Sequence, residues 1–140
     1  MNVDAIRDGI VIDHITAGRA MTLYRLLGLE GLDVPVAMIT GAVSGRLGRK
    51  DIIKIDADIP IDFNVIGYVD PGATVNLIRD GELREKKQIQ MPEKLVNVIA
   101  CRNPRCITGT EQEIDQIFFL ADREKKEYRC AYCETKAAVI

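Results

Sequence analysis

The chain has 140 residues, a formal net charge of −2 at pH 7 and an ordinary hydrophobic fraction of 47%. This length suits one domain or two small ones, and no apolar run approaches the roughly 20 residues that a membrane-spanning helix needs. The balance of charge does not favour binding to nucleic acid by general electrostatic attraction.

The first quarter of the chain predicts a strand followed by a helix. Residues 10–15 are rich in β-branched side chains, which favour a strand. Strand alternation places the odd-numbered residues, including Ile15, on one face and the even-numbered residues, including His14, on the other. Apolar residues at helical spacing then predict a helix that runs from Gly18 to about Leu29.

The next segments complete a recognisable order of elements. Apolar stretches at 34–43 and 51–59 flank a loop with two glycines, and residues 61–72 fit a short helix capped by Asp62. A strand over 74–79, the turn signal Asp80-Gly81 and a charged strand over 82–89 follow. This order predicts an α+β class, with a ferredoxin-like (split βαβ) domain and an extra edge strand over residues 1–93.

All four cysteines lie in the last forty residues, in the pairs Cys101-x4-Cys106 and Cys130-x2-Cys133. Two close pairs of thiolates are what a tetrahedral structural zinc site requires, and a closed four-sulfur set leaves no open position for a catalytic water. Short strands expected at 117–120 and 137–140 predict a zinc-ribbon-like β domain over residues 94–140.

The cysteines leave two alternatives to a metal site open at this point: two disulfides in a secreted domain, or four unrelated buried thiols. No signal-peptide pattern is visible at the start of the sequence, which favours a reducing cytoplasm and a metal site.

The first 93 residues hold no convincing catalytic group: His14 is the only histidine, and no P-loop or GxGxxG motif occurs. Lys50 and Lys54 would share one face of a strand with Cα atoms roughly 13 Å apart, which suits a polyphosphate. From the pattern alone, a solvated edge strand explains these lysines more simply. A solvated hairpin face likewise explains the charges at 85–87.

Residues 9–15, 48–55 and 73–76, followed by the two cysteine pairs, together resemble the regulatory chain of aspartate carbamoyltransferase over essentially the whole length. The resemblance implies a non-catalytic chain that pairs with itself through its N-terminal domain. It implies that the zinc domain docks on the catalytic chains, which carbamoylate aspartate in pyrimidine biosynthesis. It also implies that the N-terminal domain binds CTP as an inhibitor and ATP as an activator.

The resemblance further implies roles for single residues. Asp13 matches an acid that contacts the ribose, Lys54 and Lys86 match lysines near the ribose, base and phosphates, and Lys50 matches a phosphate-side lysine. His14 follows the matched acid and is a candidate for phosphate contact. The other implied nucleotide-site positions are Ala5, Ile6, Val11, Asn76, Ile78 and Leu83.

A zinc-ribbon protein that binds nucleic acid is the competing hypothesis. Residues 94–140 hold eight Lys/Arg against seven Asp/Glu, and residues 1–93 hold eleven against fourteen. Neither half therefore shows a strongly basic face, and we expect no nucleic-acid partner and no membrane partner.

Overall fold

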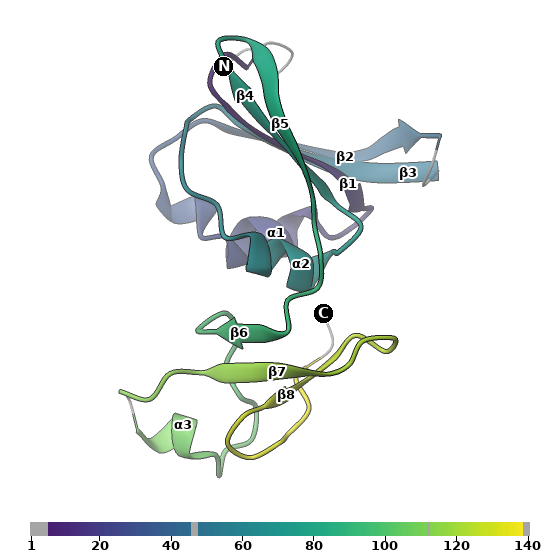
Figure 1. The fold of residues 1–140 in the computed structure, drawn as a ribbon. Helices are drawn as coiled ribbons and strands as arrows, with labels where there is room; N and C mark the ends of the chain where they lie inside the picture. Colours follow the sequence, from purple (N-terminus) through teal and green to yellow (C-terminus); the bar gives the residue numbers. More distant parts are fainter. Residues whose placement is uncertain (1–5, 46–47, 112, 139–140) are drawn as a thin grey trace. The chain divides into compact units, whose positions relative to one another are not determined.

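The computed structural model describes residues 6–45, 48–111 and 113–138, and the chain divides into two compact units, residues 1–90 and 91–140. The first unit contains, in chain order, β1 (Gly9–Thr16), α1 (Ala20–Leu26), the 3-10 turn η1 (Leu29–Gly31), β2 (Val36–Ser44), β3 (Gly48–Ile55), α2 (Phe63–Val69), β4 (Thr74–Arg79) and β5 (Glu82–Gln88) (Figure 1).

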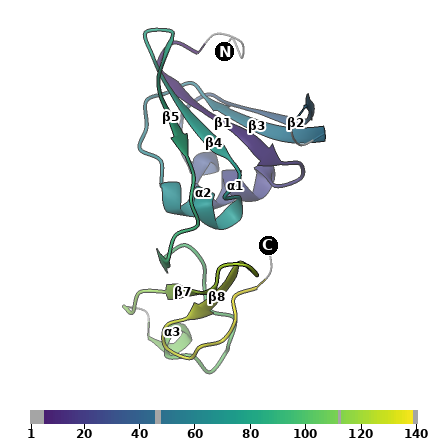
Figure 2. The same cartoon turned by 45° about the vertical axis from the view of Figure 1, so that its right-hand side comes forward.

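The first unit is one antiparallel sheet with both α-helices on the same face (Figures 1 and 2). The strand order is β2-β3-β1-β4-β5, so β3 lies between β1 and β2, and β1 lies between β3 and β4. This is the split βαβ arrangement, extended by one edge strand. The predicted α+β class and the extra strand are confirmed.

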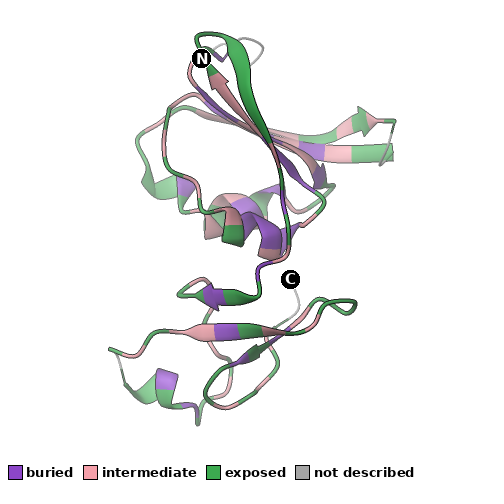
Figure 3. Cartoon of the chain, in the orientation of Figure 1, coloured by how far each residue is buried: buried purple, intermediate pink, exposed green. Residues whose placement is uncertain are grey.

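The core of this unit fills the space between the sheet and its two helices. Ile12 from β1, Ile53 from β3 and Val75 from β4 are fully buried, as are Leu23 of α1 and Ile66 of α2. Figure 3 shows buried segments on the strands and on both helices. Within the described part of the chain, no helix lies on the opposite face of the sheet (Figure 1). Every second residue of the central strands is therefore available to a ligand or a partner.

The alternation predicted for the first strand is wrong at its end. Ile15 is fully buried on the core side, not on the face of Asp13. The register between β1 and β3 shifts between Ile12 and Ile15, and His14 has a φ of 57°. A β-bulge adds one unpaired residue at this point and so inverts the alternation.

Of three other predicted features, one boundary differs from the structure, and a helix cap and a turn are confirmed. The first helix ends at Leu26, short of the predicted Leu29, because Gly28 takes a left-handed φ of 70° that stops the helix. Asp62 does cap the second helix, where its side chain accepts a hydrogen bond from Asn64 N at 2.9 Å. The Asp80-Gly81 turn joins β4 to β5 as predicted.

A buried carboxylate fixes the loop that follows β1. Asp51 is 1% exposed, and its oxygens accept hydrogen bonds from Gly18 N at 2.9 Å, Ala20 N at 3.2 Å and Gly41 N at 3.0 Å. Three backbone donors compensate for the removal of this carboxylate from water. Asp51 thereby ties the start of α1 to Gly41, which lies in β2 where the register with β3 shifts between Ile39 and Ala42. It also holds the segment that follows Asp13 and His14.

The second unit is a three-stranded antiparallel sheet with one short helix. Its elements are β6 (Lys94–Val96), α3 (Ile107–Thr110), β7 (Ile117–Asp122) and β8 (Glu127–Cys130), and the strand order is β6-β7-β8. The sequence did not predict α3. The last predicted strand is not formed at residues 137–138, and residues 139–140 lie outside the described part.

The core of the second unit is small. Among its described residues, the large apolar side chains that are buried are Leu95, Phe118 and Tyr128. The Tyr128 hydroxyl donates to Pro92 O at 2.6 Å, which fixes the entry to this unit. So little buried apolar surface gives limited stability without a further constraint.

Within the described ranges, no helix has both the length and the hydropathy that a membrane-crossing helix requires.

Candidate metal centre and ligand-binding face

The four cysteines meet at one point of the second unit. Their sulfur atoms all lie within 4.8 Å of one another, and all four thiols are free of disulfide bonds. Cys101 Sγ is 3.5 Å from Cys133 Sγ, and Cys106 Sγ is 3.7 Å from Cys130 Sγ. A zinc ion with Zn–S bonds of about 2.3 Å would hold its sulfurs roughly 3.8 Å apart. The cluster therefore fits a single tetrahedral metal ion.

Threonine hydroxyls lie on two of these sulfurs. Thr108 Oγ1 donates to Cys106 Sγ at 3.1 Å, and Thr135 Oγ1 is 3.2 Å from Cys133 Sγ. The hydroxyl and then the backbone N–H of Thr108 hold the pKa of Cys106 below its ordinary value. The same two groups of Thr135 lower the pKa of Cys133 to about 6. These contacts favour the thiolate form that a metal binds.

The thiol of Cys101 has the opposite tendency. Burial, together with its neighbouring thiols, raises the pKa of Cys101 to about 12. Thiols held this close cannot all ionise without a cation among them, because like charges at this distance repel strongly. A bound metal cation would remove that conflict.

On the first unit, four of the predicted residues form one row across four strands. Val11 of β1 pairs with Lys54 of β3 on one side and with Asn76 of β4 on the other, and Asn76 pairs with Lys86 of β5. Directly paired residues share a face of the sheet. Since Ile12 beside Val11 is buried on the core side, this row lies on the face without helices.

A bulge in β5 brings Leu83 onto the same face. The register between β4 and β5 shifts between Leu77 and Ile78, so Leu83 pairs with Ile78 while Lys86 pairs with Asn76. In a regular strand, two residues three apart would point to opposite faces. Ile78 and Leu83 thus form an apolar end beside the row of Lys54, Val11, Asn76 and Lys86.

The bulge in β1 holds the acidic group of this face. Lys50 Nζ is 2.9 Å from Asp13 Oδ1, and both side chains are about one-fifth exposed, at 17% and 21%. Asp13 Oδ1 also accepts a hydrogen bond from His14 N at 2.6 Å, and His14 Nδ1 is 3.0 Å from Thr74 Oγ1. Strained residues and bulges of this kind are enriched at binding sites.

The pKa of Asp13 reflects two opposed effects. Burial raises it, but the hydrogen bonds from Lys50 and from the backbone N–H of His14 outweigh burial and hold the pKa below its ordinary value. Asp13 is therefore ionised at neutral pH and accepts hydrogen bonds without donating them.

Asn76 carries an unmet hydrogen-bonding group in the middle of the row. Its side-chain oxygen Oδ1 is buried and accepts no hydrogen bond within the described part of the chain. A buried acceptor without a donor costs free energy, and native proteins seldom leave one unpaired. A donor on a bound ligand or water would satisfy it.

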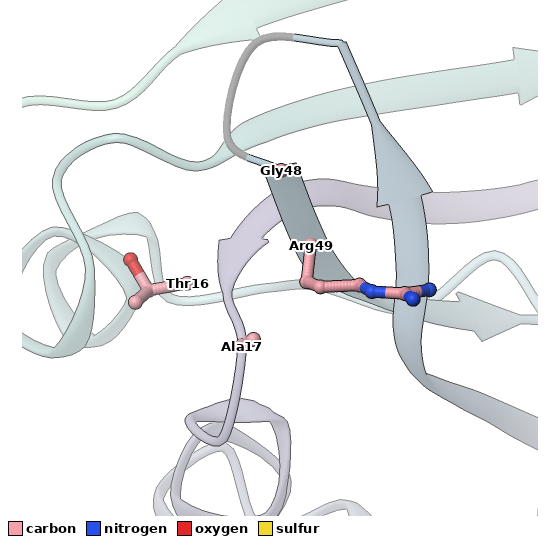
Figure 4. Close-up of a pocket in the computed structure, with 4 residues that line it drawn as sticks. All are labelled: Thr16, Ala17, Gly48 and Arg49. Atoms are coloured by element: carbon pink, nitrogen blue, oxygen red, sulfur yellow. The ribbon is translucent and has the colours of Figure 1, made fainter.

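The remaining predicted residues are less directly placed. Ile6 is only 7% exposed, so its side chain belongs to the core and only its backbone could frame a ligand. Ala5 lies outside the described residues. An open pocket lined by Thr16, Ala17, Gly48 and Arg49 contains none of the predicted site residues (Figure 4). Arg49 reaches across β2 there and donates to Gly41 O at 3.1 Å.

Sequence reasoning did not identify the two threonines beside the sulfurs. It named Asn76 as a site position but did not show that its side-chain oxygen is buried and unpaired. A Cys-x-Thr spacing after the second cysteine of each pair was the available signal for the threonines. No sequence signal shows that an asparagine oxygen is left unpaired.

The fold and the cysteine cluster define an α+β protein whose second unit is a metal-binding β domain. Residues 1–90 match the family model "Aspartate carbamoyltransferase regulatory chain, allosteric domain", and residues 93–138 match the model for the metal binding domain of the same chain. The chain belongs to the family of aspartate carbamoyltransferase regulatory chains, and the predicted resemblance is confirmed.

Relatives over the full length agree with this assignment. The aspartate carbamoyltransferase regulatory chain of Clostridium tetani is 45% identical over 141 residues, covering 100% of this chain and 98% of the relative. That of Clostridium botulinum (strain Hall) is 46% identical over 134 residues, covering 96% and 92%. That of Bifidobacterium longum is 45% identical over 137 residues, covering 98% and 99%.

A regulatory chain is the non-catalytic subunit of this enzyme, and catalytic chains are its partners. The main prediction from the sequence is therefore supported over the alternative of a nucleic-acid-binding zinc ribbon.

The ion pair of Asp13 gives a pH-dependent prediction. Because the folded-state pKa lies below the ordinary value of about 3.9, its contribution to stability is complete above that value and is lost as the pH falls through the folded-state pKa. Asp13→Asn should therefore lower the melting temperature at neutral pH, and the difference from wild type should shrink below about pH 4.

The measurement is the melting temperature of both proteins by circular dichroism between neutral pH and acid. Asp33→Asn is the control, since Asp33 is exposed and should change little at any pH. A difference for Asp13→Asn that stays constant into strong acid would contradict the ion pair.

Proposed function

We propose that the helix-free face of the first sheet binds nucleoside triphosphates, CTP and ATP among them, and that the second unit transmits this binding to the catalytic chains. The observation that carries the proposal is the buried, unpaired Asn76 Oδ1 in a row with Lys54 and Lys86. It supports a ligand that offers a hydrogen-bond donor and negative charge together.

The face offers an apolar end, hydrogen-bond acceptors and cations, which correspond to the base, the sugar and the phosphates of a nucleotide. Ile78 and Leu83 present an apolar end that suits a base. Asn76 Oδ1 can accept from an exocyclic amino group, which cytosine and adenine both carry, or from a sugar hydroxyl. Ionised Asp13 suits a sugar hydroxyl, since it can only accept.

The cations of the face suit the phosphates. Lys54 and Lys86 are separated by two strands, or roughly 14 Å between backbones, with Val11 and Asn76 between them as a floor. Lysines act as mobile point charges towards phosphate. Lys50 and His14 extend the set at the bulge of β1, where Asp13 offsets part of the positive charge before a ligand arrives.

For the metal, we propose one structural zinc ion held by Cys101, Cys106, Cys130 and Cys133. Four thiolates in a tetrahedral cluster are the donor set that zinc favours in structural sites. With four protein ligands, the ion would supply folding free energy and no reaction step. Reduced thiols of this kind, and the pyrimidine-pathway partner, support a cytoplasmic location.

We also propose that the first unit pairs with a second copy along β2. The nine residues of β2 carry no charge, and Val43 is 78% exposed. The other edge of the sheet, β5, has five charged residues among seven. Charged edges resist pairing, while a long uncharged edge strand favours it. The contrast supports self-association through β2.

Regulation then requires a difference in affinity. An effector shifts the catalytic chains only if it binds their two quaternary states unequally. In this proposal, residues 1–93 form the allosteric domain and residues 94–140 the docking domain. The segment between β5 and β6 has to carry the change from one to the other. Neither nucleic acid nor membrane is expected as a partner.

The nucleotide site is tested by replacing each of two neighbouring lysines with alanine. Lys86→Ala should weaken CTP and ATP binding about tenfold or more, because a charge-assisted contact is worth roughly 1.5–3 kcal/mol. Lys87→Ala is the matched control, since Lys87 Nζ lies 4.7 Å from the centroid of the Phe63 ring, beside α2. Titration calorimetry measures both affinities. Equal effects of the two substitutions would remove Lys86 from the site.

The division of labour is tested by metal removal. Chelation of zinc from the complex with catalytic chains should unfold residues 91–140 and release the regulatory chains, because this unit has a small core. CTP binding to the released chain should persist. Size-exclusion chromatography and calorimetry report the two effects, and zinc addition should restore the complex. Loss of CTP binding while the first unit stays folded would contradict the proposal.

The dimer edge is tested by adding one charge. Val43→Lys should shift the free regulatory chain towards monomer, because a buried lysine at a strand pairing is unfavourable. Sedimentation velocity measures the change. Glu82→Lys on β5 is the control and should leave the dimer intact. A Val43→Lys chain that remains dimeric would exclude pairing through this part of β2.

A further inference from the structure

Each cysteine pair is followed by a threonine at the same spacing. Thr108 stands two residues after Cys106, and Thr135 stands two residues after Cys133. Thr108 is 8% exposed and its hydroxyl donates to Cys106 Sγ at 3.1 Å; Thr135 Oγ1 lies 3.2 Å from Cys133 Sγ. The first cysteine of each pair has no threonine at that spacing, so the two pairs share the same asymmetry.

The backbone carbonyl of each threonine is connected to the other cysteine of its own pair. In the second pair the connection is direct, because Cys130 N donates to Thr135 O at 3.0 Å. In the first pair the side chain of Gln116 makes the connection. Gln116 Oε1 accepts from Cys101 N at 3.1 Å, and Gln116 Nε2 donates to Thr108 O at 3.4 Å.

These contacts form two similar sets of hydrogen bonds around the sulfur cluster, one for each cysteine pair. In each pair, the threonine hydroxyl contacts the sulfur of the second cysteine. The threonine carbonyl is linked to the backbone N–H of the first cysteine, directly in the second pair and through Gln116 in the first. Thr110, in the same short helix as Thr108, donates instead to Ile107 O at 3.1 Å. Contact with a sulfur is therefore a property of the Cys-x-Thr position and not of every threonine nearby.

We propose that Thr108 and Thr135 are positioning residues of the metal centre, each setting the separation and orientation of the two sulfurs in its pair. The inference rests on the proposed zinc site. Thr108 Oγ1 donates to Cys106 Sγ, and Thr135 Oγ1 would donate to Cys133 Sγ once that thiol has lost its proton to the metal; such a donor stabilises the charge of a thiolate. Gln116 has the same task in the first pair, where the longer x4 spacing leaves a gap between Cys101 and Thr108.

The test compares valine and serine substitutions in the full chain. Thr108→Val and Thr135→Val keep the side-chain shape and remove the hydroxyl, so the fold should survive. Each should weaken zinc binding about tenfold or more, as outer-shell substitutions at metal sites do. Thr108→Ser and Thr135→Ser keep the hydroxyl and should restore affinity. Thr110→Val is the matched control and should bind zinc as wild type does.

Two readouts separate positioning from packing. Competition with a chromogenic chelator gives zinc affinity, and the thiolate-to-cobalt charge-transfer band of the Co²⁺-loaded chain reports the sulfurs directly. The valine variants should shift that band and the serine variants should return it. Valine variants with wild-type affinity and spectrum would overturn the inference, as would serine variants that fail to restore both or an equal loss in Thr110→Val.

The wild-type chain separates failure of the metal centre from failure of the positioning role. If it takes up no zinc, the proposed metal centre fails and the inference fails with it. If it binds one zinc per chain while the valine variants behave as wild type, the metal centre stands and only the positioning role is lost.

Discussion

The second unit depends on four sulfur atoms held within 4.8 Å of one another. Its described residues bury only three large apolar side chains, Leu95, Phe118 and Tyr128. A core of that size recovers little of the conformational entropy lost on folding. The thiolates repel one another unless a cation lies among them, so folding of this unit is coupled to metal uptake.

The first unit has a larger apolar core and leaves one face of its sheet without a covering helix among the described residues. Its core is built from aliphatic side chains between sheet and helices. The central position of β1 lets Val11 pair with residues on both sides, so side chains from four strands lie in one row. The bulge at Asp13 and His14 then turns an acid towards this face without exposing Ile15.

Much of this architecture was accessible from the sequence, because its signals are local. The Asp80-Gly81 turn, the Asp62 cap and the paired cysteines each depend on a few adjacent residues. The bulges in β1 and β5 depend on the registers of neighbouring strands, so simple alternation misplaced Ile15. The early end of α1 follows from the left-handed Gly28, which competed with an apolar pattern that continued to Leu29.

For the candidate site too, some residues could be named from the sequence, while their arrangement is seen only in the folded structure. The lysines were named through family resemblance, and their spacing alone favoured a solvated edge. Only strand register shows that Lys54 and Lys86 share a row, and only the packed structure shows that Asn76 Oδ1 has no donor among the described residues. Hydrogen bonds to Cys106 and Cys133 likewise arise from tertiary structure, although the Cys-x-Thr spacing was visible in the sequence.

The bulge in β5 has a consequence for how this family can vary in length. Loss of the one extra residue between Leu83 and Lys86 would leave a strand with better backbone pairing and nearly the same composition. Leu83 and Lys86 would then be two residues apart and would stay on the same face, beside Ile78 and Asn76. A related chain with β5 shorter by this one residue can therefore keep both the apolar contact and the cation on the face without helices.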